Sequence, residues 1–381
     1  MSNPIDRDLI RSLFLNDIPL MDVRAPVEFS QGAFPCAVNH PLMNDQERHD
    51  VGVRYQQQGQ DAAVKLGNKL VSGEIKEQRI AQWQAFAKEH PNGYLYCFRG
   101  GLRSRTTQQW LKESGVDLPL VNGGYKAMRR VLIDELEHSI ADSRFIILGG
   151  KTGTGKTWLL KELSGAIDLE GFAHHRGSSF GRFPDGQPSQ INFENSLSIA
   201  LMKHRSRGIR QFWLEDEGRL IGSLSLPQSL QQKMKQSSLV LLEEDLQYRI
   251  SITLKDYVID LESYYRSYFE QMDRHTVKDS SSDNDEAFKQ LSNYLLDSLA
   301  RIKKRLGGER YQKIEKQMQD ALQEHKNSGN IDLHRIWIES LLISYYDPMY
   351  DYQLENKQQQ FVFRGNSHQI LANQKKILDL D

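Results

Sequence analysis

A glycine-rich segment near the middle of the chain constrains the fold more than any other feature. The run Arg144-Phe-Ile-Ile-Leu-Gly-Gly150 is typical of a buried strand that ends in glycines. Gly150 to Thr157 then fits the pattern G-x-x-x-x-G-K-[ST], and Trp158-Leu-Leu-Lys-Glu-Leu163 begins a helix. This order of strand, loop and helix predicts a loop whose backbone N–H groups wrap a diphosphate. A coincidental glycine-rich turn is the alternative.

The residues of this phosphate loop have separate expected roles. Lys156 is expected to neutralise the diphosphate, and the Thr157 hydroxyl to reach a magnesium ion. The acidic strand end Glu215-Asp216-Glu217 could supply Asp216 or Glu215 as a further ligand through water, although a solvated strand end explains it equally well. No base-recognition motif is evident, so the sequence leaves ATP and GTP binding open. The candidate diphosphate-binding residues are Gly150, Gly153, Thr154, Gly155, Lys156 and Thr157.

The residues before the phosphate loop alternate between strand and helix patterns. Such alternation predicts an α/β domain with a parallel sheet, and we expect it to occupy residues 1–140. The expected strands are residues 18–23, 37–39 and 94–98, and the expected helices are residues 75–90, 106–114 and 125–139.

The second domain, residues 141–381, is expected to be a P-loop α/β domain with a helical C-terminal extension. Apolar runs followed by acids predict strands at residues 211–214 and 239–242. Apolar residues then step by three and four on both sides of Gly307-Gly308, which predicts an antiparallel helical pair. The extension covers about residues 260–345 and is partly basic, and residues 279–286 are expected to form a mobile link.

Composition excludes several classes of protein. The chain has 381 residues, two cysteines and a net charge of −1. Two cysteines cannot form a disulfide framework in a chain of this length. No apolar run approaches the roughly 20 residues that span a bilayer. We therefore expect a cytoplasmic, monomeric enzyme without a membrane segment, in which any RNA contact is made by a local basic patch.

The second chemically informative segment is Tyr96-Cys97-Phe98-Arg99-Gly100-Gly101-Leu102-Arg103-Ser104. A cysteine between a strand and a glycine-rich turn into a helix lies where backbone N–H groups and the helix dipole favour a thiolate. Two arginines add positive charge, so the same cradle would hold an anion on the sulfur. A buried structural cysteine is the alternative, and we assign that role to Cys36. The candidate catalytic residues are Cys97, Arg99, Gly100, Gly101 and Arg103.

The N-terminal domain resembles the rhodanese sulfur carriers. The resemblance is carried by Leu20-Met-Asp22-Val-Arg24-Ala-Pro-Val-Glu28-Phe29, the Cys97 loop and Asn122-Gly-Gly124. It implies that the cysteine carries a chalcogen and that the Asp-Val-Arg segment helps to hold the loop. The loop from Cys97 to Arg103 is seven residues long, one more than single-domain sulfurtransferases usually have, which suggests a phosphate-bearing donor or a chalcogen larger than sulfur.

Basic residues suggest contacts with diphosphate or RNA, although a charged helix face is ordinarily solvated surface. Nearby tyrosines could stack on bases, but tyrosines at such spacing are more often helix packing. Adjacent histidines at 174–175 lack a third ligand, and we reject a metal there. The candidate contacts are Arg176, Ser178, Ser179, Arg182, Arg205, Lys303, Lys304 and Arg305.

The whole chain resembles the bacterial tRNA 2-selenouridine synthases. The further segments that carry this resemblance are His175-Arg-Gly-Ser-Ser-Phe-Gly181, Asn192-Phe-Glu-Asn195 and Tyr346-Asp-Pro-Met-Tyr350. It implies that wobble 2-thiouridine of tRNA is converted to 2-selenouridine through S-geranyl-2-thiouridine. Geranyl diphosphate and selenophosphate would be the co-substrates, Cys97 would carry perselenide, and an enzyme that supplies selenophosphate would be a partner. No tightly bound organic cofactor is implied.

Three rival functions remain open. The first is a sulfurtransferase fused to an ATP-dependent small-molecule kinase. The second is a phosphatase, suggested by the Cys-x5-Arg spacing of the loop, for which we find no general acid. The third is a nucleotide-switched binding module with an inert cysteine.

Overall fold

The structure, a computed structural model, describes residues 5–273, 280–355, 357 and 361–379. The chain forms two compact units. The first consists of Met1–Asp142 together with Ser189–Gly208, and the second of Ser143–Pro188 together with Ile209–Asp381. The first unit is therefore discontinuous in sequence, which the sequence analysis did not predict.

The first unit is built on a parallel sheet of β2 (Ala37–Asn39), β1 (Leu20–Asp22) and β3 (Tyr94–Tyr96), in that order. The predicted α/β organisation with a parallel sheet is confirmed. Each strand is only three residues long, so the surrounding helices supply most of the core. These helices are α1 (Arg7–Leu15), α2 (Pro26–Gln31), α3 (Asp45–Leu70), α4 (Gly73–Glu89), α5 (Leu102–Glu113), α6 (Gly124–Ala141) and α9 (Gln190–Ser206).

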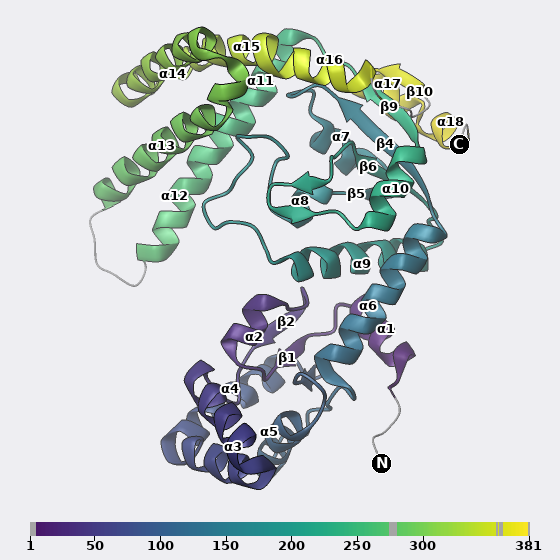
Figure 1. The fold of residues 1–381 in the computed structure, drawn as a ribbon, viewed down its shortest axis with the longest axis vertical. Coiled ribbons are helices and arrows are strands. Elements are labelled where there is room, and N and C mark those ends of the chain that lie inside the picture. The colour runs from purple at the N-terminus through teal and green to yellow at the C-terminus, as the bar shows by residue number, and fades with distance from the viewer. Residues whose placement is uncertain (1–4, 274–279, 356, 358–360, 380–381) are drawn as a thin grey trace. The chain divides into compact units, whose positions relative to one another are not determined.

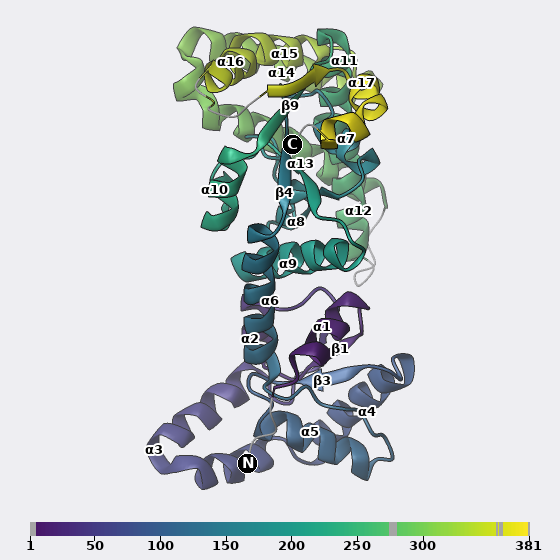
Figure 2. The ribbon, with the colours of Figure 1, turned by 90° about the vertical axis from the view of Figure 1, so that its right-hand side faces the viewer.

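Helix α3 was not predicted from the sequence. Its sequence is mostly polar, and it is interrupted at Gly59, where φ is 79°. A positive φ of this kind favours glycine, which has no Cβ to clash with the backbone. Figure 2 shows α3 as two helical stretches that meet at a bend.

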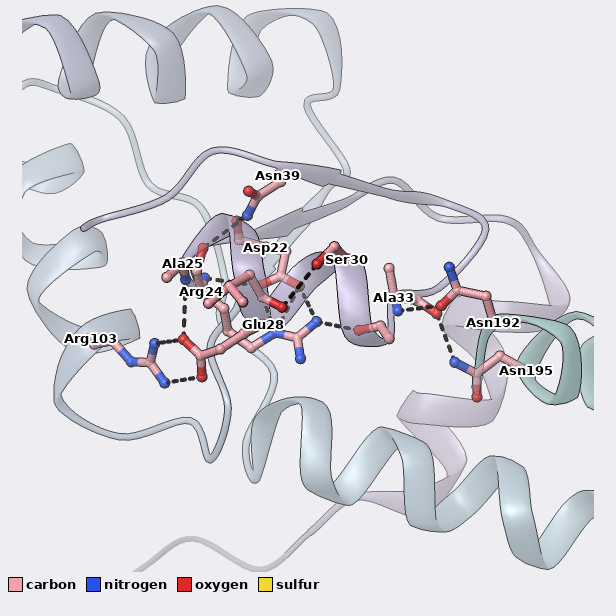
Figure 3. A network of polar contacts seen from close by, with 12 residues as sticks. Asp22, Arg24, Ala25, Glu28, Ser30, Ala33, Asn39, Arg103, Asn192 and Asn195 are labelled. Atoms are coloured by element: carbon pink, nitrogen blue, oxygen red, sulfur yellow. Dashed lines mark hydrogen bonds and ion pairs between the residues drawn. The ribbon is translucent and has the colours of Figure 1, made fainter. Parts of the chain in front are cut away.

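Helix α9 completes the first unit, although it lies between segments of the second unit in sequence. The Asn192 side chain accepts a hydrogen bond from Ala33 N at 2.7 Å, and Asn195 donates to the Ala33 carbonyl at 2.7 Å. Ile199 and Met202 join an apolar cluster with residues of α1 and α6. The two asparagines of the segment 192–195 therefore fix this helix to the loop after α2 (Figure 3).

The second unit contains an all-parallel sheet in the order β10-β9-β4-β6-β5. Its strands are nearly uniformly apolar, as expected for a parallel sheet covered on both faces. The predicted strands at residues 144–150, 211–214 and 239–242 are confirmed, and the short strands β5, β7 and β8 and the edge strand β10 were missed. The strands are β4 (Arg144–Gly150), β5 (Ala166–Ile167), β6 (Gln211–Glu215), β9 (Ser238–Leu242) and β10 (Phe361–Gly365), with a separate hairpin of β7 (Leu220–Ile221) and β8 (Leu224–Ser225).

The C-terminal part of the second unit is helical, as expected. Figure 1 shows α12 (Asp260–Asp273), α13 (Ser280–Leu306) and α14 (Gly308–Ser328) side by side, and their apolar faces form one core cluster. The predicted break at residues 307–308 is confirmed. The predicted link at 279–286 is wrong from Ser280 onward, where α13 has already begun, because a polar helix start was read as a linker; residue 279 lies outside the described residues.

The remaining elements of the second unit surround its sheet or extend the helical part. Helices α7 and α8 follow β4 and β5, and two short π-helical segments, η1 and η2, continue α11 and α15. The bounds are α7 (Lys156–Glu162), α8 (Leu169–Ala173), α10 (Gln228–Gln236), α11 (Leu246–Leu254), η1 (Lys255–Ile259), α12 (Asp260–Asp273), α13 (Ser280–Leu306), α14 (Gly308–Ser328), α15 (His334–Leu341), η2 (Leu342–Tyr346), α16 (Asp347–Glu355), α17 (Ser367–Ala372) and α18 (Gln374–Asp379). Among the described residues, no helix combines the length and apolar character needed to cross a membrane.

Candidate functional site

The phosphate loop connects the central strand β4 to helix α7. Gly153 and Gly155 have φ values of 81° and 78°, which other residues rarely adopt. A Cβ at Gly153 would also lie 2.6 Å from the Arg249 carbonyl oxygen. The glycines are therefore required by backbone geometry and by close packing on α11. This favours a specific loop conformation over a coincidental glycine-rich turn.

The loop is braced from the C-terminal helices. The buried Arg249 guanidinium donates to the Thr152 carbonyl at 3.0 Å and forms two hydrogen bonds with Asp347, at 3.0 and 2.5 Å. Lys151 pairs with Asp351 at 2.8 Å. Two acids of the segment after η2 thus hold the loop, and Asp347 gives a structural reason for an acid in the sequence Tyr346-Asp-Pro-Met-Tyr350.

Lys156 and Thr157, the two loop residues expected to contact a diphosphate and its metal ion, both form hydrogen bonds within the protein. Lys156 Nζ donates to the Gly150 carbonyl at 2.7 Å, so its ammonium lies over the loop. The Thr157 hydroxyl lies 3.0 Å from Glu215 Oε1 and 3.3 Å from Glu170 Oε2. Of the two acids expected to accompany Thr157, Glu215 contacts it, whereas Asp216 lines the cavity described below and forms an ion pair with Lys357.

Three carboxylates crowd together beside Thr157. Burial and the neighbouring Glu217 charge raise the pKa of Glu170, and burial and Glu170 raise that of Glu215. Burial and Glu215 raise the pKa of Glu217 to about 7. No group of three or more His, Cys, Asp or Glu side chains in the described part of the chain forms a ready metal cage. Hydroxyl and carboxylate oxygens do suit Mg²⁺, which usually keeps several waters and shares substrate phosphates.

This carboxyl cluster predicts a specific pH dependence of stability. Because the native state keeps a proton on Glu217 that the unfolded chain has lost, the free energy of unfolding should fall as pH rises from about 4.5 to 7. Glu217→Gln should remove about 1–3 kcal/mol of that decrease. Urea unfolding across this pH range measures it, with the exposed Glu162→Gln as the control. If the free energy of unfolding of Glu217→Gln had the same pH slope as that of the unaltered protein, a raised pKa of Glu217 would be contradicted.

The phosphate loop opens into a cavity of about 520 Å³. Lys156 of the loop, Lys161, Arg176 and Arg305 bring positive charge to its lining. Aromatic and apolar side chains also line it, and so do the carboxyl groups of Glu170, Asp216, Glu217, Asp256 and Asp260. Ser178 and Ser179 also line the cavity, whereas Arg182, Lys303 and Lys304 do not. The aromatic and apolar lining residues are Trp158, Leu220, Ile252, Tyr257, Tyr345, Tyr346, Met349 and Tyr350.

The cysteine loop of the first unit is fixed by its backbone. The Cys97 and Phe98 carbonyls accept hydrogen bonds from Tyr125 N at 2.9 Å and Lys126 N at 3.0 Å, at the start of α6. Gly100 has a φ of 64°, and a Cβ there would lie 2.8 Å from Gly123 N. A glycine at position 100 is therefore needed for the cysteine loop to pack closely against the start of α6.

The Cys97 thiol lies at the bottom of this loop, where its residue is 3% exposed. Its sulfur is 3.2 Å from the Ser104 hydroxyl, which itself donates to the Gly101 carbonyl. Apolar residues of the same cluster, including Leu95 and Leu111, surround it. Helix α5 begins at Leu102, and no side chain of the described residues caps it. The first N–H groups of α5 are therefore left for another partner at the end of the helix that the loop encloses. The thiol is thus more enclosed than we expected.

The two loop arginines have different environments. Arg103 donates to both carboxylate oxygens of Glu28, at 2.6 and 3.1 Å (Figure 3). Glu28 also pairs with Arg48 at 3.1 Å. Burial opposes ionisation of Glu28, but the arginine outweighs it and the pKa of Glu28 is lowered. Arg99 is exposed, with its guanidinium 5.8 Å from the Phe98 ring.

The Asp-Val-Arg segment holds the base of this network. Arg24 and Asp22 are both buried and share three contacts of 2.6–3.0 Å, and Arg24 also donates to the Gly32 carbonyl at 2.7 Å. A buried pair with further hydrogen bonds in this geometry fixes local structure, and losing one partner would leave an unpaired charge.

The basic residues that we considered for RNA do not form one group. Arg205 belongs to the first unit and pairs with Asp142 at 2.6 Å. Lys303 and Arg305 belong to the second unit, where the Lys303 ammonium lies 4.5 Å from the Tyr311 ring centre and Arg305 lines the phosphate-loop cavity. Tyr265, Tyr345 and Tyr346 are buried, which favours packing over base stacking.

Several residues of both sites were given no role from the sequence. Glu170 and Arg249 stand in no recognisable motif, and Glu28 lies in the segment that resembles the rhodanese carriers but was not assigned a role. Glu28 gives one weak signal, since it lies two residues after Pro26, at the third position of α2, and accepts a bond from Ala25 N.

Comparison with known proteins gives consistent matches. A family model described as "tRNA 2-selenouridine synthase AAA domain" matches residues 143–378. A protein of Marinobacter nauticus named tRNA 2-selenouridine synthase is 52% identical over 370 residues, 97% of each chain. Proteins of the same name from Alcanivorax borkumensis and Pseudomonas syringae pv. syringae are 53% and 52% identical, and each match covers 95% of this chain and 96% and 95% of those proteins.

Proposed function

The chain belongs to the tRNA 2-selenouridine synthase family, and on this premise we propose that it replaces the sulfur of wobble 2-thiouridine in tRNA by selenium. It is a tRNA-modifying enzyme, a transferase. We further propose that the reaction passes through S-geranyl-2-thiouridine, with geranyl diphosphate and selenophosphate as co-substrates.

One observation supports the geranyl route above all others. Aromatic and apolar side chains line the same cavity as the phosphate loop and its cations. A prenyl diphosphate needs an apolar surface next to the loop that holds its diphosphate. The lining by Tyr345, Tyr346 and Met349 would supply such a surface.

In the first step, the 2-thio sulfur attacks C1 of geranyl diphosphate, a C–S bond forms and the C–O bond breaks. The diphosphate leaves with the electron pair, so negative charge develops on the leaving group. Lys156, Arg176 and Arg305 line the cavity where this charge would appear and would stabilise it. Thr157 and Glu215 would hold Mg²⁺, which would supply further positive charge next to the leaving diphosphate.

In the second step, a selenium nucleophile attacks C2 of the S-geranyl base and geranylthiolate leaves. We assign Cys97 as the selenium carrier, in a rhodanese-like first domain. The assignment is supported by the position of Cys97 at the end of β3, directly before the uncapped start of α5. Amide groups there would stabilise a selenium anion on the cysteine sulfur.

The carrier cycle balances when a small thiol takes part. Attack of the perselenide on C2 leaves the base joined to Cys97 through selenium and sulfur. A thiolate then attacks the Cys97 sulfur, releases 2-selenouridine and leaves a mixed disulfide. Selenophosphate displaces the thiol through its selenium, and water removes the phosphoryl group as phosphate, which restores the perselenide.

Mass analysis of tRNA nucleosides tests the proposal. Thiolated tRNA with geranyl diphosphate alone should yield S-geranyl-2-thiouridine, and selenophosphate with a thiol alone should leave 2-thiouridine unchanged. Both co-substrates together should yield 2-selenouridine. Formation of 2-selenouridine at the same rate without geranyl diphosphate would exclude the geranyl route. Thiosulfate-to-cyanide turnover that is insensitive to tRNA would instead favour a sulfurtransferase fused to a kinase.

A further inference from the structure

The first unit contains an apolar hollow of about 390 Å³ that the steps above do not use. It lies between α3 and the start of α5. Val51, Ala63 and Val64 line it from α3, and Leu102 and Trp110 line it from α5. This volume falls within the roughly 300–1,000 Å³ that is usual for small-ligand sites.

The hollow adjoins the cysteine loop. Leu102 and Arg103, which end that loop, form part of its lining. Leu42 and Val71, also in the lining, belong to the same apolar cluster as Cys97. Large apolar side chains at its mouth remain accessible to solvent, since Tyr55 is 57% and Leu102 53% exposed. An accessible apolar surface next to a reactive group is typical of a site that binds an apolar part of a substrate.

We propose that this hollow binds the ten-carbon chain of the S-geranyl base during selenium transfer, an inference that rests on the proposed function. In that step a C–Se bond forms at C2, the C2–S bond breaks, and the electron pair leaves on sulfur, which takes a proton from water. C2 must therefore reach the selenium on Cys97, and the attached chain must be placed beside the same loop.

An adjoining hollow would let the geranyl chain and the nucleotide of the same substrate occupy different places. This second hollow, of about 930 Å³, shares Met43, Val51, Tyr55 and Arg103 with the apolar one. Its other lining residues include the charged Arg24, Glu28 and Arg48. Figure 3 shows Arg103 paired with Glu28 at this place. The second hollow also contains aromatic residues, Phe98 and Tyr125, so a base with its polar edges suits this mixed lining, whereas a prenyl chain suits the apolar hollow.

Narrowing the apolar hollow tests the proposal. Val64→Trp should lower kcat/KM for selenation of an S-geranyl anticodon stem-loop by roughly tenfold or more, and should change that for the S-methyl analogue less than about twofold. Geranylation of 2-thiouridine should be unaffected. Ile75→Trp on α4 is the control, since Ile75 is 44% exposed and lines neither hollow. Equal losses on both substrates, or no loss on either, would overturn the proposal.

A second variant and a binding measurement cover the case in which Val64→Trp folds poorly. Tyr55→Ser should also favour the S-methyl over the S-geranyl substrate relative to the unaltered protein. S-geranyl-2-thiouridine nucleoside should change tryptophan fluorescence, and Trp110→Phe should remove that change, because Trp110 lines the hollow. No change in the unaltered protein would overturn the proposal. If the unaltered protein selenates no S-geranyl substrate, the proposed function itself fails, which is a different result.

Discussion

Selenium incorporation is expected to fall by on the order of 10³-fold or more in a Cys97→Ser variant, while S-geranyl-2-thiouridine still accumulates. A serine oxygen cannot carry selenium, so the second step has no carrier. The substitution should leave the loop intact, because the Cys97 sulfur lies 3.2 Å from the Ser104 hydroxyl and a hydroxyl can keep that hydrogen bond. Nucleoside mass analysis with both co-substrates and a thiol measures the two products.

Cys36→Ser is the matched control for this variant. Cys36 is half-buried, and burial raises the pKa of its thiol to about 11, so it is a poor nucleophile near neutral pH. Both products should form as in the unaltered protein. Retained selenation in Cys97→Ser would mean that selenophosphate attacks C2 directly and that the enclosed thiol is structural.

The phosphate loop was predictable because all of its information is local. The eight residues from Gly150 to Thr157 include the glycines that adopt positive φ values, the lysine and the hydroxyl. The cysteine loop was predictable for the same reason. Its enclosure was not, because Leu95 and Leu111 come from elements whose packing depends on the tertiary fold.

The acid that contacts Thr157 could not be chosen from the local sequence. The strand end supplied Glu215 and Asp216 as alternatives, and successive side chains of a strand point to opposite faces. Only the fold decides that Glu215 contacts Thr157 and that Asp216 pairs with Lys357. Glu170 could not be predicted as a neighbour of Thr157, because nothing in its own segment of sequence links it to the phosphate loop.

Helix α9 was missed for a different reason. Its position in the sequence places it in the second domain, and its asparagines look like ordinary polar residues. Asn192 and Asn195 gain their role only when Ala33 presents both its N–H and its carbonyl to them. Helix α9 also packs through apolar side chains such as Ile199 and Met202, but its own sequence does not say which unit they contact.

Geranylation is expected to fall by about 10²–10³-fold in a Lys156→Ala variant, while selenation of tRNA that already carries the S-geranyl group stays largely intact. The lysine ammonium lies over the phosphate loop, 2.7 Å from the Gly150 carbonyl, and is placed to neutralise a leaving diphosphate. The second step releases geranylthiolate and not diphosphate, so it has no use for this charge. Rates with each starting tRNA measure the two steps separately.

Lys235→Ala is the control for this variant, because Lys235 is an exposed lysine of α10 outside the cavity lining. Lys156 also lowers the pKa values of Glu170 and Glu217, so its loss should leave these carboxyls more fully protonated. Urea unfolding of Lys156→Ala at pH 7 separates a loss of fold from a loss of diphosphate binding. A folded variant that loses both steps equally would mean that one site serves both reactions. That outcome would also remove the reason for placing selenium transfer at Cys97 alone.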